Sequence, residues 1–259
     1  MLTSNPFAEL SAYIDVAVMQ TFVIVMFALV VVGTLFDVIH KKSAKYFFED
    51  WKRSKTKGTN QVGGGQVISM AVQTMASEVL TSSEFCSTQR RVAHLLTMYG
   101  FVGYVAATVI MVFGCPAFLI PTSEAWPTLW HIGALMVCVG GYWFWFFIRV
   151  DVAAEGNSPF SISQADLFIL SLLASSTLAL VWSWLGTSTI GWLAFGLYVL
   201  SSAVLFGSIP WSKFAHMFFK PSAALQKRVA EAAGSRSNLP APADKPETFG
   251  SARGAPTNY

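Results

Sequence analysis

Residues 167–212 read LFILSLLASSTLALVWSWLGTSTIGWLAFGLYVLSSAVLFGSIPWS and contain no Asp, Glu, Lys or Arg. A membrane-spanning helix needs about 20 predominantly apolar residues, so this uncharged stretch is long enough for two crossings. The run Gly-Thr-Ser-Thr-Ile-Gly at residues 186–191 divides it, because glycine and small polar residues favour a tight turn. The stretch therefore predicts two transmembrane helices joined by a short turn.

Three further uncharged stretches, residues 16–36, 92–123 and 125–148, each predict one more span. The composition agrees with this reading, because 54% of the residues are apolar and only 12% are charged, against about 25% charged in soluble domains. A net charge of +3 is also too small to indicate a nucleic-acid partner. The sequence thus predicts an all-α fold, a five-span transmembrane helical bundle.

The basic residues predict the orientation of this bundle, since cytoplasmic flanks of membrane helices carry the excess of Lys and Arg. Seven of the 17 basic residues lie in residues 41–57, Arg90 and Arg91 precede the second span, Arg149 ends the third, and seven follow Trp211. With five spans, this pattern fits only an N-terminus outside and a cytoplasmic C-terminus. We expect a multi-pass protein of the cytoplasmic (inner) membrane.

The predicted organisation has two parts. Residues 1–221 form the transmembrane bundle, which includes a cytoplasmic amphipathic segment at 41–91 that we expect to lie on the membrane surface as helix. Residues 222–259 are a cytoplasmic tail in which apolar residues become sparse and prolines recur. We expect this tail to be helical to about Ala233 and then disordered.

The spans contain no Asp, Glu, Lys or Arg away from their ends, which argues against ion-coupled transport. The three cysteines form no C-x-x-C pair, which leaves four histidines as candidate ligands: His40, His94, His131 and His216. The first, second and fourth of these share the cytoplasmic level of the predicted topology. Neutral imidazoles can bind haem iron from facing helices. The alternative is that these histidines are ordinary residues of the membrane boundary.

Two stretches extend this reading: CSTQRRVAHLLTMYGF at residues 86–101 and PWSKFAHM at residues 210–217. They resemble the signature stretches of a membrane cytochrome b family that includes the nitrate reductase gamma subunit and the cytochrome b subunit of heterodisulfide reductase. The same family includes the membrane subunit of the quinone-interacting oxidoreductase of sulfate reducers. The resemblance covers residues 16–220. The length of the chain also resembles that of a small relative, the membrane anchor of adenylylsulfate reductase.

The resemblance implies that His94 and His216 bind the iron of a haem b and that Arg90 and Arg91 meet its propionates. Two-haem members carry a second histidine pair, about ten residues after the first ligand and about eighteen before the other. Tyr104 and Tyr198 occupy those positions here. We therefore expect one haem b or none.

The function implied by the resemblance is that of a membrane anchor and electron-transfer subunit. It would link cytoplasmic iron–sulfur and flavoprotein subunits, of adenylylsulfate reductase or a heterodisulfide-reductase-like complex, to the quinone pool. Catalysis on the sulfur substrate would belong to those subunits, so this chain is either non-catalytic or a quinone-reactive part of an oxidoreductase. Two alternatives are a structural anchor without a cofactor and, less favoured, a small permease.

Quinone is expected to be an exchangeable substrate that approaches near a membrane boundary. Trp126, Trp130 and His131 stand together at the predicted outer start of the third span, where an imidazole can hydrogen-bond a quinone carbonyl. The alternative is an ordinary aromatic belt, which is common at this depth.

Overall fold

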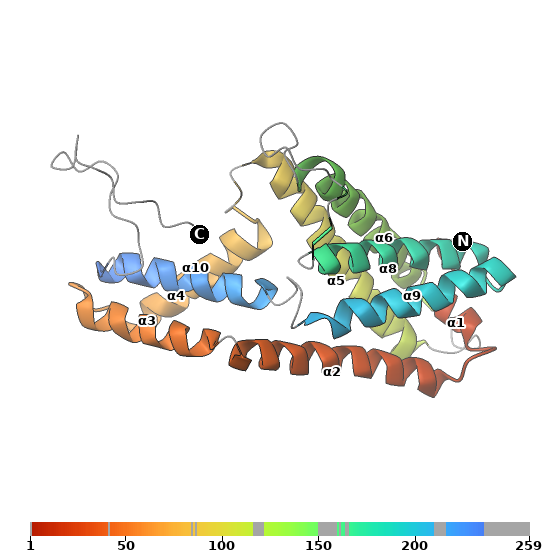
Figure 1. The fold of residues 1–259 in the computed structure, drawn as a ribbon, viewed down its shortest axis with the longest axis horizontal. Coiled ribbons are helices and arrows are strands. Elements are labelled where there is room, and N and C mark those ends of the chain that lie inside the picture. The colour runs from red at the N-terminus through yellow and green to blue at the C-terminus, as the bar shows by residue number, and fades with distance from the viewer. Residues whose placement is uncertain are drawn as a thin grey trace.

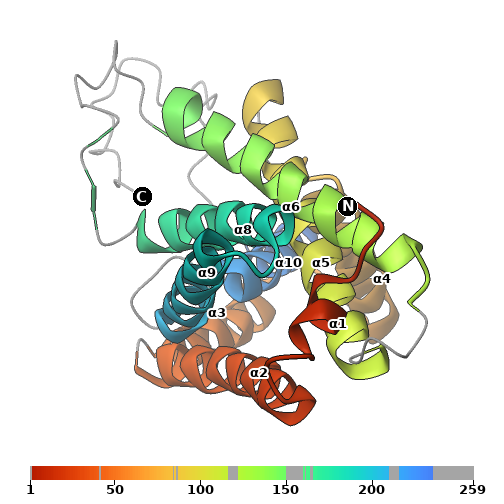
Figure 2. The same ribbon diagram turned by 90° about the vertical axis from the view of Figure 1, so that its right-hand side faces the viewer.

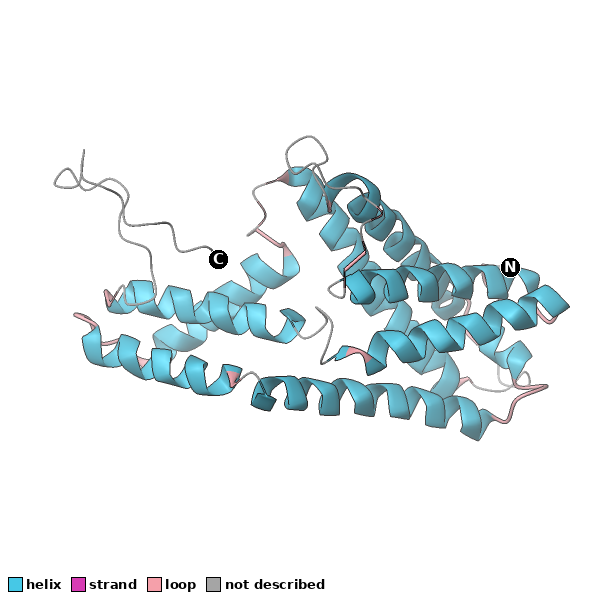
Figure 3. Ribbon diagram, in the orientation of Figure 1, coloured by secondary structure: helices cyan, strands magenta, loops and turns pink. Residues whose placement is uncertain are grey.

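The computed structural model of the chain describes residues 2–40, 42–83, 85, 87–115, 122–149, 160, 162–163, 166–209 and 216–235. Within these residues all regular structure is helical and no strand occurs (Figure 3). The predicted all-α fold is confirmed.

Five helical segments are long and apolar enough to cross a membrane, as the sequence predicts. They are α2 (Val16–His40), α5 (Thr88–Gly114), α6 (Ala125–Trp143) continued by the π-helical η2 (Phe144–Ile148), α8 (Leu167–Leu185) and α9 (Thr189–Gly207). A short helix, α1 (Pro6–Leu10), lies beside the start of α2 at one end of the bundle (Figure 1). The five-span bundle is therefore confirmed, with each predicted stretch contributing the expected number of helices.

The turn between α8 and α9 shows why the uncharged stretch divides at residues 186–191. Gly186 has φ +55°, in the left-handed region that favours glycine. A Cβ on Gly191 would lie 2.1 Å from the carbonyl oxygen of Gly186, so only glycine fits there. The side chain of Ser188 caps α9 by accepting a hydrogen bond from the Gly191 amide at 3.1 Å.

Helices α5 and α6 approach each other closely, because glycines face backbone across their contact. A Cβ on Gly133 would lie 2.7 Å from the carbonyl oxygen of Gly100, and one on Gly140 would lie 2.6 Å from that of Ala93. Small residues allow this approach in membrane helices, where packing drives association. The α5–α6 pair is consequently the most tightly packed part of the bundle. It holds the candidate functional site in place.

Four helices form a cap at the other end of the bundle: α3 (Ser43–Lys57), α4 (Gly64–Thr74), η1 (Met75–Leu80) and α10 (His216–Ala233). α3 continues the line of α2 away from the bundle (Figure 1), and in the view along that direction α3 lies behind α2 (Figure 2). Lys42, with φ 54°, breaks the helix between them. The cap thus extends beyond the end of α2, and the expectation that the segment 41–91 lies on the membrane surface stays a prediction.

Contacts with α10 hold the cap together. The guanidinium of Arg228 donates to Ser77 at 2.6 Å and to Glu78 at 2.9 Å, and the Gln226 side chain donates to the carbonyl of Phe47 at 3.3 Å. α10 crosses residue 221 and ends at Ala233, so residues 222–233 of the expected tail are packed helix. Its predicted disordered part lies largely outside the described residues.

An ion pair between half-buried Arg149 and buried Asp166 connects the cap-side ends of the third and fourth spans. Arg149, just after η2, donates through Nε to Asp166 at 2.9 Å and forms a second bond through its terminal nitrogen. Asp166 also accepts from the amide and hydroxyl of Ser163, at 2.8 and 2.7 Å. Burial raises the pKa of the Asp166 carboxyl, but these hydrogen bonds outweigh burial and hold its pKa below the usual value.

Candidate functional site

His94 lies in the second turn of α5, at the cap end of the bundle. Its half-buried ring contacts the ring of Phe85, with centroids 5.1 Å apart. The ammonium group of Lys220, in the first turns of α10, lies 5.3 Å from the centroid of the same ring. Phe85 therefore joins the start of α10 to His94.

The other residues predicted to hold a haem stand at this end too. His216 is the first residue of α10, and its side chain lies outside the described structure. Arg90 is exposed, and Arg91 uses its Nε to donate to the carbonyl of Thr81 at 2.7 Å. His40, the last residue of α2, is exposed and stacks on Phe36 with centroids 5.5 Å apart. The helices that carry His94 and His216 thus both have these residues at the cap end of the bundle.

The predicted quinone cluster at the start of α6 is packed into the core. Trp130 is fully buried, and its indole donates to the Thr108 hydroxyl at 3.0 Å. His131 is 4% exposed, and its two ring nitrogens lie 2.7 Å from the Pro127 carbonyl and the Ser183 hydroxyl. Because a carbonyl only accepts, Nδ1 donates to Pro127 and Nε2 accepts from Ser183. Trp126 is half-buried against the same core. Both imidazole nitrogens are therefore already used within the protein.

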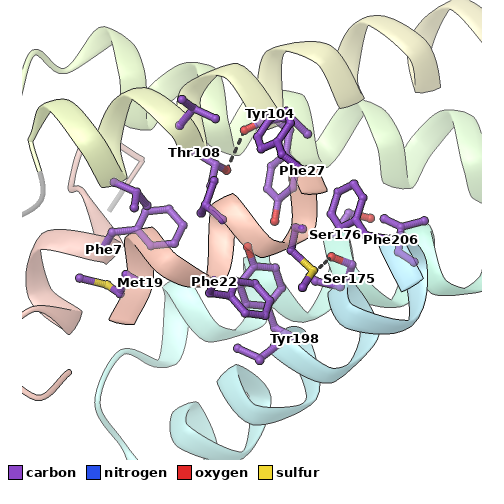
Figure 4. A pocket seen from close by; sticks show the side chains of 18 of the residues that line it. Phe7, Met19, Phe22, Phe27, Tyr104, Thr108, Ser175, Ser176, Tyr198 and Phe206 are labelled. Atoms are coloured by element: carbon purple, nitrogen blue, oxygen red, sulfur yellow. Dashed lines mark hydrogen bonds between the residues drawn. The ribbon is translucent and has the colours of Figure 1, made fainter. Parts of the chain in front are cut away.

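An apolar cavity of about 440 Å³ lies inside the bundle, between α2, α5 and α9 (Figure 4). Its walls are mainly the aliphatic and aromatic side chains of those helices, with Phe7 and Leu10 of α1 at one end. Hydroxyl groups of Tyr104, Tyr198, Ser175 and Ser202 are among the few polar groups that line it.

Tyr104 and Tyr198 point toward one another across this cavity (Figure 4). Each ring packs on a buried tryptophan. The ring centroids of Tyr104 and Trp130 are 5.3 Å apart, and those of the stacked rings of Tyr198 and Trp182 are 5.8 Å apart. The two positions that the resemblance pairs are therefore neighbours in space. The sequence predicted only that these tyrosines stand where a second histidine pair would be. It did not reveal the cavity, because no local pattern shows which residues of different helices face a common space.

The comparisons with known proteins add no relative. No family model, no curated protein and no solved structure matches the chain. Among the described residues, no three His, Cys, Asp or Glu side chains gather as a metal-binding group. The chemistry of the site therefore follows from its own residues alone.

Proposed function

We propose that the chain is the membrane subunit of an oxidoreductase, anchoring cytoplasmic iron–sulfur and flavoprotein subunits and passing electrons between them and the quinone pool through one haem b. The resemblance of residues 86–101 and 210–217 motivates this proposal. The structural observation that carries it is the contact of both His94 and Lys220 with Phe85, because it places the start of α10, whose first residue is His216, beside His94.

In the proposed orientation the bundle spans the inner membrane and the cap lies in the cytoplasm. The segment 41–57 carries seven basic and two acidic residues, whereas the residues expected outside include no Lys or Arg. The cap helices extend beyond the end of the bundle (Figure 1), which supports their use as the docking surface. The partner would be adenylylsulfate reductase or a heterodisulfide-reductase-like complex, whose own subunits act on the sulfur substrate.

In this proposal His94 and His216 hold the haem, and Arg90 supplies positive charge at the same end. When bound, the haem supplies one-electron transfer. Arg91, already bonded to the Thr81 carbonyl, fixes the start of α5 against the end of η1 and so orients His94. Phe85 covers one side of the His94 imidazole and limits its contact with water.

The haem is tested by a pyridine haemochrome assay of the purified protein and of two variants. His94→Ala and His216→Ala should each abolish the reduced b-type spectrum, because a site with two imidazole ligands fails when either is lost. His40→Ala is the matched control: its imidazole is exposed and stacked at the end of α2, so haem content should not change. Two haems per chain would refute the proposal.

A second candidate function is a structural anchor without a cofactor. The cap favours it, because α3, α4 and α10 build a docking platform whatever the bundle contains. Absence of haem from freshly prepared membranes, together with retained co-purification of the partner, would select this candidate. Reversing four basic charges in residues 41–57 should weaken co-purification under either function, and unchanged retention at low salt would count against this surface.

A further inference from the structure

The cavity between α2, α5 and α9 contains a buried polar atom that no described residue satisfies. Tyr104 is 7% exposed, and its hydroxyl has no hydrogen-bond partner. The hydroxyls of Tyr198 and Ser175 are polar neighbours close enough to interact with it, but neither has the geometry of a hydrogen bond to Tyr104, and Ser175 is bonded to Ser202 at 2.8 Å. Burying a hydroxyl without a partner costs about 1–3 kcal/mol, so the site is poised for a hydrogen-bond acceptor.

The depth of this hydroxyl restricts the acceptor. Tyr104 comes 16 residues after the first residue of α5 and ten before its last, Gly114. At a rise of 1.5 Å per residue, it stands about 24 Å from the cap end of α5 and about 15 Å from the other end. Phospholipid head groups lie at the membrane surface, so a ligand from the bilayer whose oxygen reaches this depth must be an uncharged, lipid-soluble molecule.

The wall formed by α2 gives such a molecule a route from the bilayer. Only Met19, Met26, Gly33 and Asp37 of its 25 residues are buried. Cavity-lining residues Phe22, Met26 and Phe27 lie on this lightly packed helix. A ligand can therefore enter sideways between α2 and its neighbours, without crossing water.

We infer that the cavity binds an uncharged, membrane-soluble ring compound whose carbonyl oxygen accepts the hydrogen bond of Tyr104. A volume of about 440 Å³ falls within the range of small-molecule sites, about 300–1,000 Å³, and accommodates a fused ring with part of an apolar chain. The inference rests on the proposed function only for a redox role of the ligand, since a quinone has this chemistry. Binding itself requires neither haem nor partner.

The test uses two ligands that differ in their carbonyl groups. Binding of radiolabelled menadione to the purified full-length protein in detergent is measured, with 2-methylnaphthalene as the competitor of similar shape that lacks carbonyls. Tyr104→Phe removes the hydroxyl and keeps the ring, and should weaken menadione binding about fivefold, the value of one neutral hydrogen bond. The inhibition constant of 2-methylnaphthalene should be the same in both proteins, because this compound has no carbonyl to accept a hydrogen bond.

Two variants complete the experiment. Tyr142→Phe is the matched control, because the Tyr142 hydroxyl lies on an exposed part of α6, bonded to Thr177 at 2.9 Å, and menadione affinity should stay unchanged. Val199→Trp fills the cavity from α9 and should abolish binding of both ligands.

Absence of saturable menadione binding to the folded protein would overturn the inference, as would equal affinity of wild type and Tyr104→Phe. The latter result would indicate that ordered water satisfies Tyr104 or that menadione binds elsewhere. The outcome is independent of the haemochrome assay. Saturable, Tyr104-dependent binding would sustain this site even where the haemochrome assay refutes the haem proposal.

Discussion

Replacing Gly133 by alanine should destabilise the bundle through a collision of backbones. A Cβ at this position lies 2.7 Å from the Gly100 carbonyl oxygen and 2.8 Å from the Tyr104 amide nitrogen. Both neighbours are backbone atoms and cannot rotate away, so α5 and α6 must separate. Relief of the contact from 2.7 Å to an ordinary distance of about 3.4 Å requires a local shift of about 0.7 Å.

A gap of that size forfeits about a quarter to a half of the dispersion energy of the atoms that face it. Overpacking of a well-packed interior costs about 1–3 kcal/mol, and we expect about 2 kcal/mol for Gly133→Ala. Because the collision falls on the backbone of Tyr104, the same change should shift that side chain and weaken menadione binding in the cavity.

The measurement is unfolding of the purified protein by SDS in mixed micelles, followed by tryptophan fluorescence. Gly196→Ala is the matched control: it also adds one methyl group to a membrane helix, but a Cβ there meets nothing within 4 Å. It should leave stability unchanged or raise it by up to about 1 kcal/mol. If Gly133→Ala proves as stable as Gly196→Ala, the close packing of α5 on α6 is not as described.

Three other predictions concern charged and polar contacts. Asp166→Asn should destabilise the protein by about 2 kcal/mol, because the largely covered guanidinium of Arg149 loses its counter-charge. Since the pKa of Asp166 is lowered in the folded state, the stability from this pair should be fully present above about pH 4. It should be lost as the pH falls through the folded pKa, and a pH titration of unfolding in the variant should lack this loss. His131→Ala should lower the free energy of unfolding by about 3 kcal/mol in the same SDS assay, because it opens a cavity and leaves the Ser183 hydroxyl without a hydrogen-bond partner. If quinol-dependent reduction of the partner survives in the folded variant, the cluster at the start of α6 is not the quinone site. Arg228→Met should leave SDS unfolding of the bundle nearly unchanged. It should increase hydrogen exchange in η1, because Glu78 loses its ion pair with Arg228. Unchanged exchange would show that the cap does not depend on this contact.

The spans could be predicted from the sequence because the bilayer leaves few alternatives. Every backbone polar group must be satisfied internally, so an uncharged stretch of sufficient length becomes a helix whatever surrounds it. The division at residues 186–191 was equally local, since Gly186 and Gly191 are required by backbone geometry within the turn itself.

The direction of the cap helices could not be predicted, because it depends on a partner far along the chain. The amphipathic pattern in residues 41–91 indicates helix with one apolar side but does not say what covers that side. In the structure α10 supplies part of the cover: Gln226 bonds to the carbonyl of Phe47, and Arg228 bonds to Glu78.

The environment of His131 depends on how α6 is rotated about its axis. Its sequence position near the start of a span is compatible with either a lipid-facing or an inward ring. The close approach at Gly133 fixes the rotation, which turns Trp130 and His131 into the bundle. The cavity also depends on contacts between residues far apart in the chain, since Tyr104 and Tyr198 lie 94 positions apart in the sequence.

The short helix α1 imposes an order on the assembly of this protein. Phe7 wedges between Trp130 and Trp182, with ring centroids 5.8 and 5.5 Å away, and the Asn5 amide donates to the Cys115 carbonyl at 3.1 Å. Those partners belong to segments synthesised long after α1 has left the ribosome. The earliest segment of the chain therefore cannot complete its contacts until α8 has been inserted.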